Sequence, residues 1–216
     1  MAFKLYNAPQ STCSQRVRFV LNSKGLAFAE EKLNLLAGDQ LKADYLKLNP
    51  HGVVPTLDHD GRIVIDSNVI NEYLDEVEPE QSFRPEDLVK RASMRTLMHF
   101  IDEMPAAAVR VPTFNLAFLP SFQKMSAEEF NAMAESKPIR REFMKTMGQR
   151  GFPQSEMDAA LARLRRTYER MDAEIEKSAG PWLLATPGIY CCGAQLVPSN
   201  VDHQRPWSPS SPFQAA

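Results

Sequence analysis

The first 77 residues switch repeatedly between two spacings of apolar residues, and this alternation restricts the fold more than any other feature of the chain. Short strand-like runs occupy residues 3–6 and 28–34, and two more flank Asp60-Gly61, a dipeptide that favours a tight hairpin turn. Helical spacing of apolar residues connects these runs, over residues 11–21, 38–49 and 67–77. The order βαβαββα predicts an α/β domain that contains both parallel and antiparallel strands.

Only helices are predicted beyond residues 79–87, a linker rich in proline and charge. The sequence thus predicts a first domain over residues 1–78 and a helical domain over residues 88–184. Two apolar stripes with helical spacing support the second domain, and both are expected to face its core. The stripes are Met94, Leu97, Met98 and Ile101, and then Met157, Leu161, Leu164, Tyr168, Met171 and Ile175.

Composition limits the class of protein. The 216 residues are 44% hydrophobic, and a net charge of -2 argues against nucleic acid or an anionic membrane as a partner. No apolar run approaches the roughly 18 residues that cross a bilayer, and a strand-like run follows Met1 almost directly, so we expect a cytoplasmic protein. The three cysteines, Cys13, Cys191 and Cys192, are too few for a disulfide framework, and no Cys/His spacing predicts a metal site.

Three motifs, in this order and spacing, resemble the cytosolic glutathione S-transferase family over roughly residues 3–184. They are STCSQRVRFVL (11–21), NPHGVVPTL (49–57) and DSNVINEYLDEV (66–77). The first is similar to the Ser-Ser-Cys opening of the zeta class, which contains maleylacetoacetate isomerases, and to the Ser-x-Cys-Ser opening of a reductive dehalogenase of chlorinated hydroquinones. The resemblance implies a thioredoxin-like N-terminal domain, a helical C-terminal domain, glutathione as co-substrate and a homodimer.

Ser11 directly precedes a predicted helix, whose first N–H groups and positive dipole end stabilise a thiolate. The resemblance implies that Ser11 donates a hydrogen bond to the glutathione sulfur and that Thr12 is a nearby second donor. The alternative is that either residue only caps the helix. Cys13 lies on the helix face of Val17 and is expected in the core, whereas the dehalogenase resemblance implies a second nucleophile that forms a mixed disulfide with glutathione.

The resemblance places the rest of glutathione on the other two motifs. A cis peptide bond between Val54 and Pro55 would leave the Val54 backbone to pair with the cysteinyl part, and a trans bond is the alternative. Asp66 is implied to hold the α-amino group, and Ser67, the predicted cap of the next helix, to hold the γ-glutamyl carboxylate. His51 is either a contact to the glycyl end or a solvated loop histidine.

The second substrate implied by the resemblance is a small hydrophobic electrophile. Its reaction is open among thioether formation, cis–trans isomerisation, ether cleavage and reductive dehalogenation, and His99, Asp102 and Glu103 either face it or are ordinary surface groups. Residues 185–216 depart from the family, because they hold five prolines and no helical period, and they are predicted to be a disordered tail. This departure favours a competing hypothesis, a degenerate binding or interaction module with little or no activity.

Overall fold

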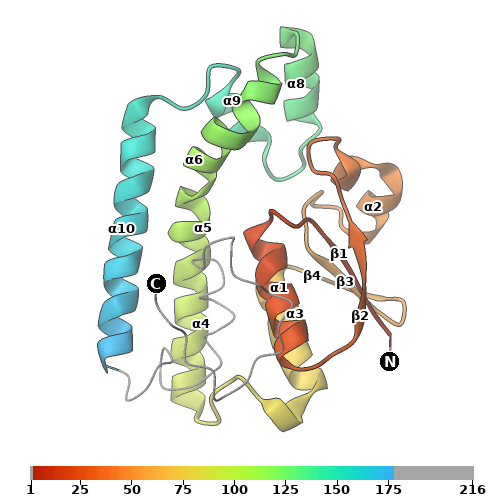
Figure 1. Cartoon of the computed structure of the whole chain (residues 1–216), viewed down its shortest axis with the longest axis vertical. Helices are drawn as coiled ribbons and strands as arrows, with labels where there is room; N and C mark the ends of the chain where they lie inside the picture. Colours follow the sequence, from red (N-terminus) through yellow and green to blue (C-terminus); the bar gives the residue numbers. More distant parts are fainter. Residues whose placement is uncertain (1, 178–216) are drawn as a thin grey trace. The chain divides into compact units, whose positions relative to one another are not determined.

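The computed structural model describes residues 2–177, which divide into two compact units (Figure 1). Unit 1 comprises residues 2–33 and Val54–Phe83, and unit 2 comprises Asn34–Val53 and residues 84–177. The tail predicted for residues 185–216, and the predicted end of the helical domain before it, lie outside the described residues.

Unit 1 is built on four strands, which are β1 (Phe3–Asn7), β2 (Phe28–Lys32), β3 (Thr56–His59) and β4 (Arg62–Ile65). They form one mixed sheet in the order β2-β1-β3-β4 (Figure 1). β1 is parallel to β2 and antiparallel to β3, and β3 and β4 form a hairpin. Asp60 and Gly61 turn this hairpin with φ angles of 51° and 82°, which confirms the turn that the dipeptide predicts.

Two helices, α1 (Thr12–Ser23) and α3 (Ser67–Val77), pack against each other on one face of this sheet (Figure 1). The connection from β2 to β3 contains a 3₁₀ turn, η1 (Asp39–Leu41), and helix α2 (Ala43–Leu48), so the predicted order βαβαββα is confirmed. The core between sheet and helices consists of apolar side chains that are 0% exposed, namely Leu5, Val17, Val20, Leu21, Leu57, Ile70 and Leu74.

A buried ion pair fixes the segment after α3, which includes the 3₁₀ turn η2 (Pro79–Gln81). Lys24 Nζ lies 2.9 Å from Asp75 Oδ1 and donates a hydrogen bond to the Glu78 carbonyl at 2.8 Å. Asp75 also accepts a hydrogen bond from the Phe83 amide at 2.7 Å, and the Phe83 ring lies 4.7 Å from Lys24 Nζ. The Lys24 and Asp75 side chains are 0% and 6% exposed, so each charge depends on the other.

The predicted helices of the second part are present in unit 2, and within residues 2–177 no helix is long and apolar enough to cross a bilayer. Pro105, Pro112 and Pro120 lie where the chain between 88 and 122 breaks into successive helical segments, because proline has no N–H to donate. The segments are α4 (Leu88–Glu103), α5 (Pro105–Ala108), α6 (Arg110–Thr113), the π-helix η3 (Phe114–Phe118), α7 (Leu119–Phe122), α8 (Ala127–Glu135), α9 (Arg141–Met147) and α10 (Gln154–Lys177).

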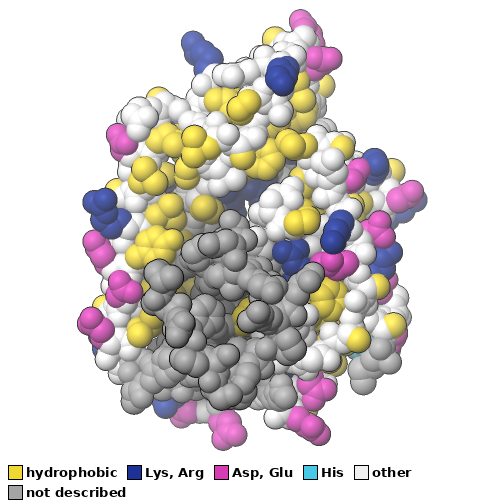
Figure 2. Space-filling model, viewed as in Figure 1, with side chains coloured by type: hydrophobic (Ala, Val, Ile, Leu, Met, Phe, Trp, Pro, Cys, Tyr) yellow, Lys and Arg dark blue, Asp and Glu magenta, His cyan; other side chains and the backbone are white. Residues whose placement is uncertain are grey.

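The first predicted stripe of this part, on α4, is buried, but the second is buried only in part. On α10 the exposed members of the stripe are Leu161 (51%), Tyr168 (47%) and Ile175 (41%). Figure 2 likewise shows hydrophobic side chains at the surface of unit 2. The residues that α10 buries are Ala160, Thr167 and Met171, of which only Met171 belongs to the predicted stripe, and α10 packs on α5, where Ala108 is 2% exposed. The prediction that the whole stripe faces a core is therefore wrong.

The buried ion pair gives a test of the fold. We expect Asp75→Asn to lower the free energy of unfolding by about 3 to 5 kcal/mol, because Lys24 then keeps a buried charge without its partner. Urea unfolding of the full chain measures this loss. The matched control is Asp44→Asn, which breaks the exposed ion pair with Lys47 and should cost less than about 1 kcal/mol. Equal losses in the two variants would contradict the role given to the buried pair.

Candidate functional site

Three connections of unit 1 meet at one edge of its sheet. Tyr6 pairs with Thr56, and Thr56 pairs with Ile65, so these residues lie side by side across β1, β3 and β4. β1 and β4 both run toward this edge, because each is antiparallel to β3. The loop after β1, the residues before β3 and the residues after β4 therefore lie at the same edge. These segments carry Ser11, Val54, Pro55, Asp66 and Ser67.

Ser11 is the N-cap of α1. Its backbone is extended, and its Oγ accepts a hydrogen bond from the Ser14 amide at 3.3 Å. Within residues 2–177 nothing accepts a hydrogen bond from the Ser11 hydroxyl, so its hydrogen can be donated to a ligand. The two roles considered for Ser11 are compatible, since capping uses a lone pair of the oxygen and donation uses the hydrogen.

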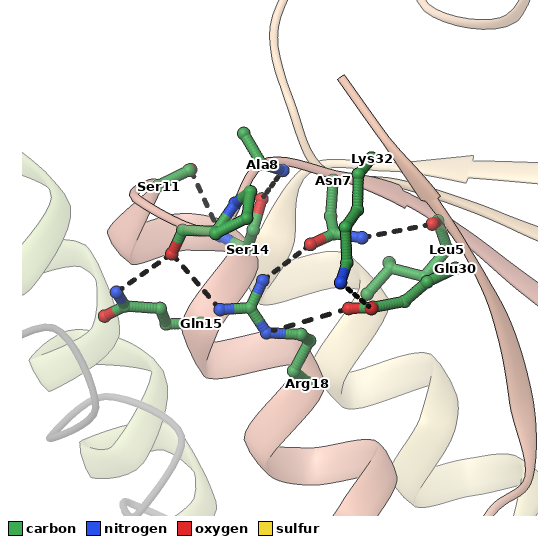
Figure 3. Close-up of polar contacts among 10 residues, drawn as sticks. Leu5, Asn7, Ala8, Ser11, Ser14, Gln15, Arg18, Glu30 and Lys32 are labelled. Atoms are coloured by element: carbon green, nitrogen blue, oxygen red, sulfur yellow. Dashed lines mark hydrogen bonds and ion pairs between the residues drawn. The ribbon is translucent and has the colours of Figure 1, made fainter. Parts of the chain in front are cut away.

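The loop between β1 and α1 is tied to the helix that follows it (Figure 3). Ser14 Oγ accepts a hydrogen bond from the Ala8 amide at 3.3 Å, and Gln15 Nε2 donates to the Pro9 carbonyl at 3.2 Å. Both side chains are buried. These contacts hold the loop, and with it the position of Ser11.

Arg18 joins the same loop to the end of β1 (Figure 3). Its Nη1 donates to Asn7 Oδ1 at 2.6 Å, and its Nη2 donates to the Pro9 carbonyl at 3.2 Å. Burial lowers the pKa of Arg18 from its ordinary value, and the Glu30 carboxylate, 4.0 Å from Nε, opposes this shift. A guanidinium stays protonated far above neutral pH, so Arg18 keeps its charge in this position.

Thr12 and Cys13 occupy the first turn of α1, and both are half-buried. Cys13 shares a helix face with Val17 and Val20, which are 0% exposed. Cys13 therefore lies at the margin of the core rather than inside it. This position fits contact with a substrate as well as packing.

The peptide bond between Val54 and Pro55 is cis, as the resemblance implies. Val54 is 8% exposed, and its backbone lies outside the ladder, because β3 begins only after Pro55. The carbonyl just before it, that of Val53, accepts hydrogen bonds from Tyr45 Oη at 2.6 Å and from Asn49 Nδ2 at 2.9 Å. These contacts fix the chain as it approaches Val54.

Asp66, and not Ser67, is the N-cap of α3, so the capping role predicted for Ser67 is wrong. Asp66 Oδ1 accepts hydrogen bonds from the Asn68 amide at 2.8 Å and the Val69 amide at 3.2 Å. An aspartate makes these bonds readily because its carboxylate reaches the N2 and N3 amides. Asp66 has a φ of 71°, which is uncommon for a residue other than glycine, and its side chain is exposed.

Ser67 is the first residue of α3 and is 3% exposed. Its Oγ accepts hydrogen bonds from two nitrogens of Arg16, from Nε at 2.9 Å and also from Nη2. Arg16 lies on α1 and is 1% exposed. The motifs predict no role for Arg16, and its place in the sequence does not distinguish it from Arg18, which also adjoins Val17 but is only half-buried.

The remaining candidates belong to unit 2. His51 is exposed in the turn after α2, and its amide donates to Asn49 Oδ1 at 3.0 Å. On α4, His99 and Glu103 are exposed and Asp102 is half-buried. The group at the sheet edge thus comprises the candidates of unit 1 alone.

The chain is similar in sequence and in fold to known proteins. Residues 10–77 match the family model of the glutathione S-transferase N-terminal domain. Protein LigF of Sphingobium sp. (strain NBRC 103272 / SYK-6) is 35% identical over 183 residues, which cover 80% of this chain and 71% of LigF. The crystal structure of LigF from Sphingobium sp. strain SYK-6, named there a beta-etherase, has a TM-score of 0.78 at 31% identity and covers 90% of this chain and 82% of that chain.

A second group of relatives matches a shorter stretch. Glutathione S-transferase Z1 of Arabidopsis thaliana is 50% identical over 90 residues, or 41% of this chain and 40% of that protein. The chain therefore spans less than half the length of this plant relative. Taken with the match to LigF, this similarity shows that this chain belongs to the glutathione S-transferase family, whose enzymes use glutathione as co-substrate.

Proposed function

We propose that this protein is a glutathione-dependent transferase in which the glutathione thiolate attacks a carbon of a small hydrophobic aryl ether. A C–S bond forms, the C–O bond breaks, and the leaving aryl oxide takes the bonding electrons and then a proton from water. An aryl ether suits this step because an aryl oxide leaves more readily than an alkoxide. The similarity to LigF, named a beta-etherase, over 80% of this chain favours an ether among the electrophiles open to the family.

The observation that carries this proposal is the start of α1. The Ser11 hydroxyl lies at the N-terminus of α1, a helix of 12 residues, and no described residue accepts its hydrogen. A thiolate bound beside Ser11 accepts that hydrogen and meets the positive end of the helix dipole. Both interactions favour the anion, so they lower the pKa of the bound thiol from about 8.5 and increase the thiolate at neutral pH.

The rest of glutathione would extend along the same edge of the sheet. The Val54 backbone, after the turn set by Pro55, would pair with the cysteinyl part as a short strand. Ser67 would donate to the γ-glutamyl carboxylate, and the exposed Asp66 would accept from the α-amino group. Thr12 is a second hydroxyl near the sulfur.

Retention on immobilised glutathione, followed by incubation with glutathione and a phenyl alkyl ether, tests the proposal. Release of the phenol together with a thioether of glutathione supports ether cleavage. Isomerisation of a cis-dienoic acid without ether cleavage would instead assign the activity of the maleylacetoacetate isomerase relatives. Retention without turnover would support the binding module, and absence of retention would refute a glutathione site.

Ser11 provides the first prediction for the chemistry. We expect Ser11→Gly to lower kcat/KM by about 10- to 100-fold at neutral pH, because a hydrogen bond to a charged sulfur is lost. Its loss destabilises the thiolate, so the pKa of bound glutathione rises, and the deficit should shrink at about pH 9, where the thiol ionises without help. Absorbance of the thiolate against pH, measured in the complex, reports this pKa.

Glycine is a tolerated N-cap, so Ser11→Gly separates donation from capping. Ser126 supplies the control, because its side chain caps α8 in the same way, through the Glu129 amide at 3.1 Å. Ser126→Ala should cost about 1 kcal/mol of stability and leave the pKa of bound glutathione unchanged. An unchanged pKa in Ser11→Gly would remove Ser11 from the mechanism.

Cys13 provides a separate prediction. If Ser11 alone activates glutathione, Cys13→Ala keeps kcat/KM within about threefold and costs about 1 kcal/mol of stability through a small cavity. Steady-state kinetics and urea unfolding of the same preparation measure both quantities. Loss of activity at unchanged stability, together with a mixed disulfide of Cys13 and glutathione in the mass spectrum, would instead make Cys13 a second nucleophile.

A further inference from the structure

The two arginines of α1 stand two residues apart and hold different parts of unit 1. Arg18 binds the loop that carries Ser11, through Asn7 and the Pro9 carbonyl. Arg16 is 99% buried and binds the Ser67 hydroxyl at the start of α3. Arg18 therefore supports the part of the site that carries Ser11, whereas the contact of Arg16 with Ser67 concerns the start of α3.

The contact between Arg16 and Ser67 determines what the Ser67 hydroxyl can still do. A serine oxygen has two lone pairs and one hydrogen. Nε and Nη2 of Arg16 both donate to this oxygen, so both lone pairs are engaged and only the hydrogen is left for another group. Within the described part of the chain nothing accepts that hydrogen, although Ser67 is 3% exposed. A buried donor without an acceptor is costly, so this hydrogen points to an acceptor on a ligand.

The charges around Ser67 favour an anionic acceptor. Arg16 places a positive guanidinium directly behind the hydroxyl, and the first amides of the 11-residue helix α3 add the positive end of its dipole. The Asp66 carboxylate is close in sequence, but its Oδ1 is committed to the Asn68 and Val69 amides. A carboxylate accepts the Ser67 hydrogen with this charge support, whereas an amine or an amide N–H offers only a second donor.

We propose that Arg16 is a positioning residue that commits the Ser67 hydroxyl to donation and so makes the start of α3 select the α-carboxylate of the γ-glutamyl group. The inference rests on the proposed function, because it assumes that glutathione is the ligand. Arg16 acts through Ser67 and does not touch the substrate. Its effect is therefore on the affinity for the carboxylate and not on the thiol.

The test compares two ligands on the full chain by isothermal titration calorimetry. One is glutathione, and the other is 4-aminobutanoyl-cysteinyl-glycine, which keeps the thiol but lacks the α-carboxylate. We expect wild type to prefer glutathione by about 10- to 100-fold, the worth of a charge-assisted hydrogen bond. Arg16→Met and Ser67→Ala should each reduce this preference to about threefold or less. The double variant should reduce it no further, because both changes act on the same hydroxyl.

Arg18→Met is the matched control, since it removes the same charge from the same helix without a contact to Ser67. It should keep the preference for glutathione, because the two ligands carry the same thiol. In Arg16→Met the pKa of the bound thiol should stay at its wild-type value, which a general loosening of the site would not allow. Loss of the preference in Arg18→Met, equal to that in Arg16→Met, would overturn the proposal.

The failure of the inference is distinguishable from the failure of the proposed function. If wild type binds both ligands equally, the selection by Arg16 and Ser67 is wrong while the glutathione site stands. If wild type binds neither, the proposed function fails. Should Arg16→Met not fold, as judged by urea unfolding, Arg16→Gln, which keeps a hydrogen-bond donor but removes the charge, decides, and a wild-type preference in that variant overturns the proposal.

Discussion

Strand β1 is the constraint on which unit 1 depends, because it has a hydrogen-bonded partner on each side. It pairs with β2 in parallel and with β3 in antiparallel register, so its direction and its end are fixed twice. Leu5, at its centre, is 0% exposed beneath the two helices. A one-residue slip of β1 would turn that side chain out of the core. The register of β1 therefore also fixes where the loop that follows it begins.

The functional consequence is a set of donors and acceptors held on rigid elements at one edge. Ser11 and Ser67 each begin or precede a helix, and each uses the oxygen of its hydroxyl for a contact inside the protein. Because that oxygen is occupied, the hydrogen is left for a ligand. In the proposed function the same chemistry thus serves two groups of glutathione, the sulfur at α1 and the γ-glutamyl carboxylate at α3. Holding both donors before the ligand arrives lowers the cost of ordering them on binding.

The core of unit 2 differs in composition from that of unit 1. Aromatic and methionine side chains fill it where successive helical segments change direction. The Phe114 ring contacts those of Phe118 and Phe143, tilted against the first and edge-on to the second, with ring centroids 4.9 Å apart in each pair. Flexible and aromatic side chains fill irregular gaps that short, proline-interrupted helices leave. Along α10 the buried residues are Ala160, Thr167 and Met171, whereas Leu161, Tyr168 and Ile175 of its apolar stripe are exposed.

The amino-acid sequence by itself determined the order of elements in unit 1, the hairpin turn at Asp60 and the position of Ser11 before a helix. These follow from local periods, turn residues and caps, which act over a few residues. Tertiary structure decided which face of α10 packs. Ala160 and Leu161 each belong to a set of residues with helical spacing, and only the set with Ala160, Thr167 and Met171 is buried. It also decided the partner of Arg16, because Ser67 lies 51 residues away in sequence. A buried charge requires a polar partner, but which residue provides it depends on the packing of α1 against α3.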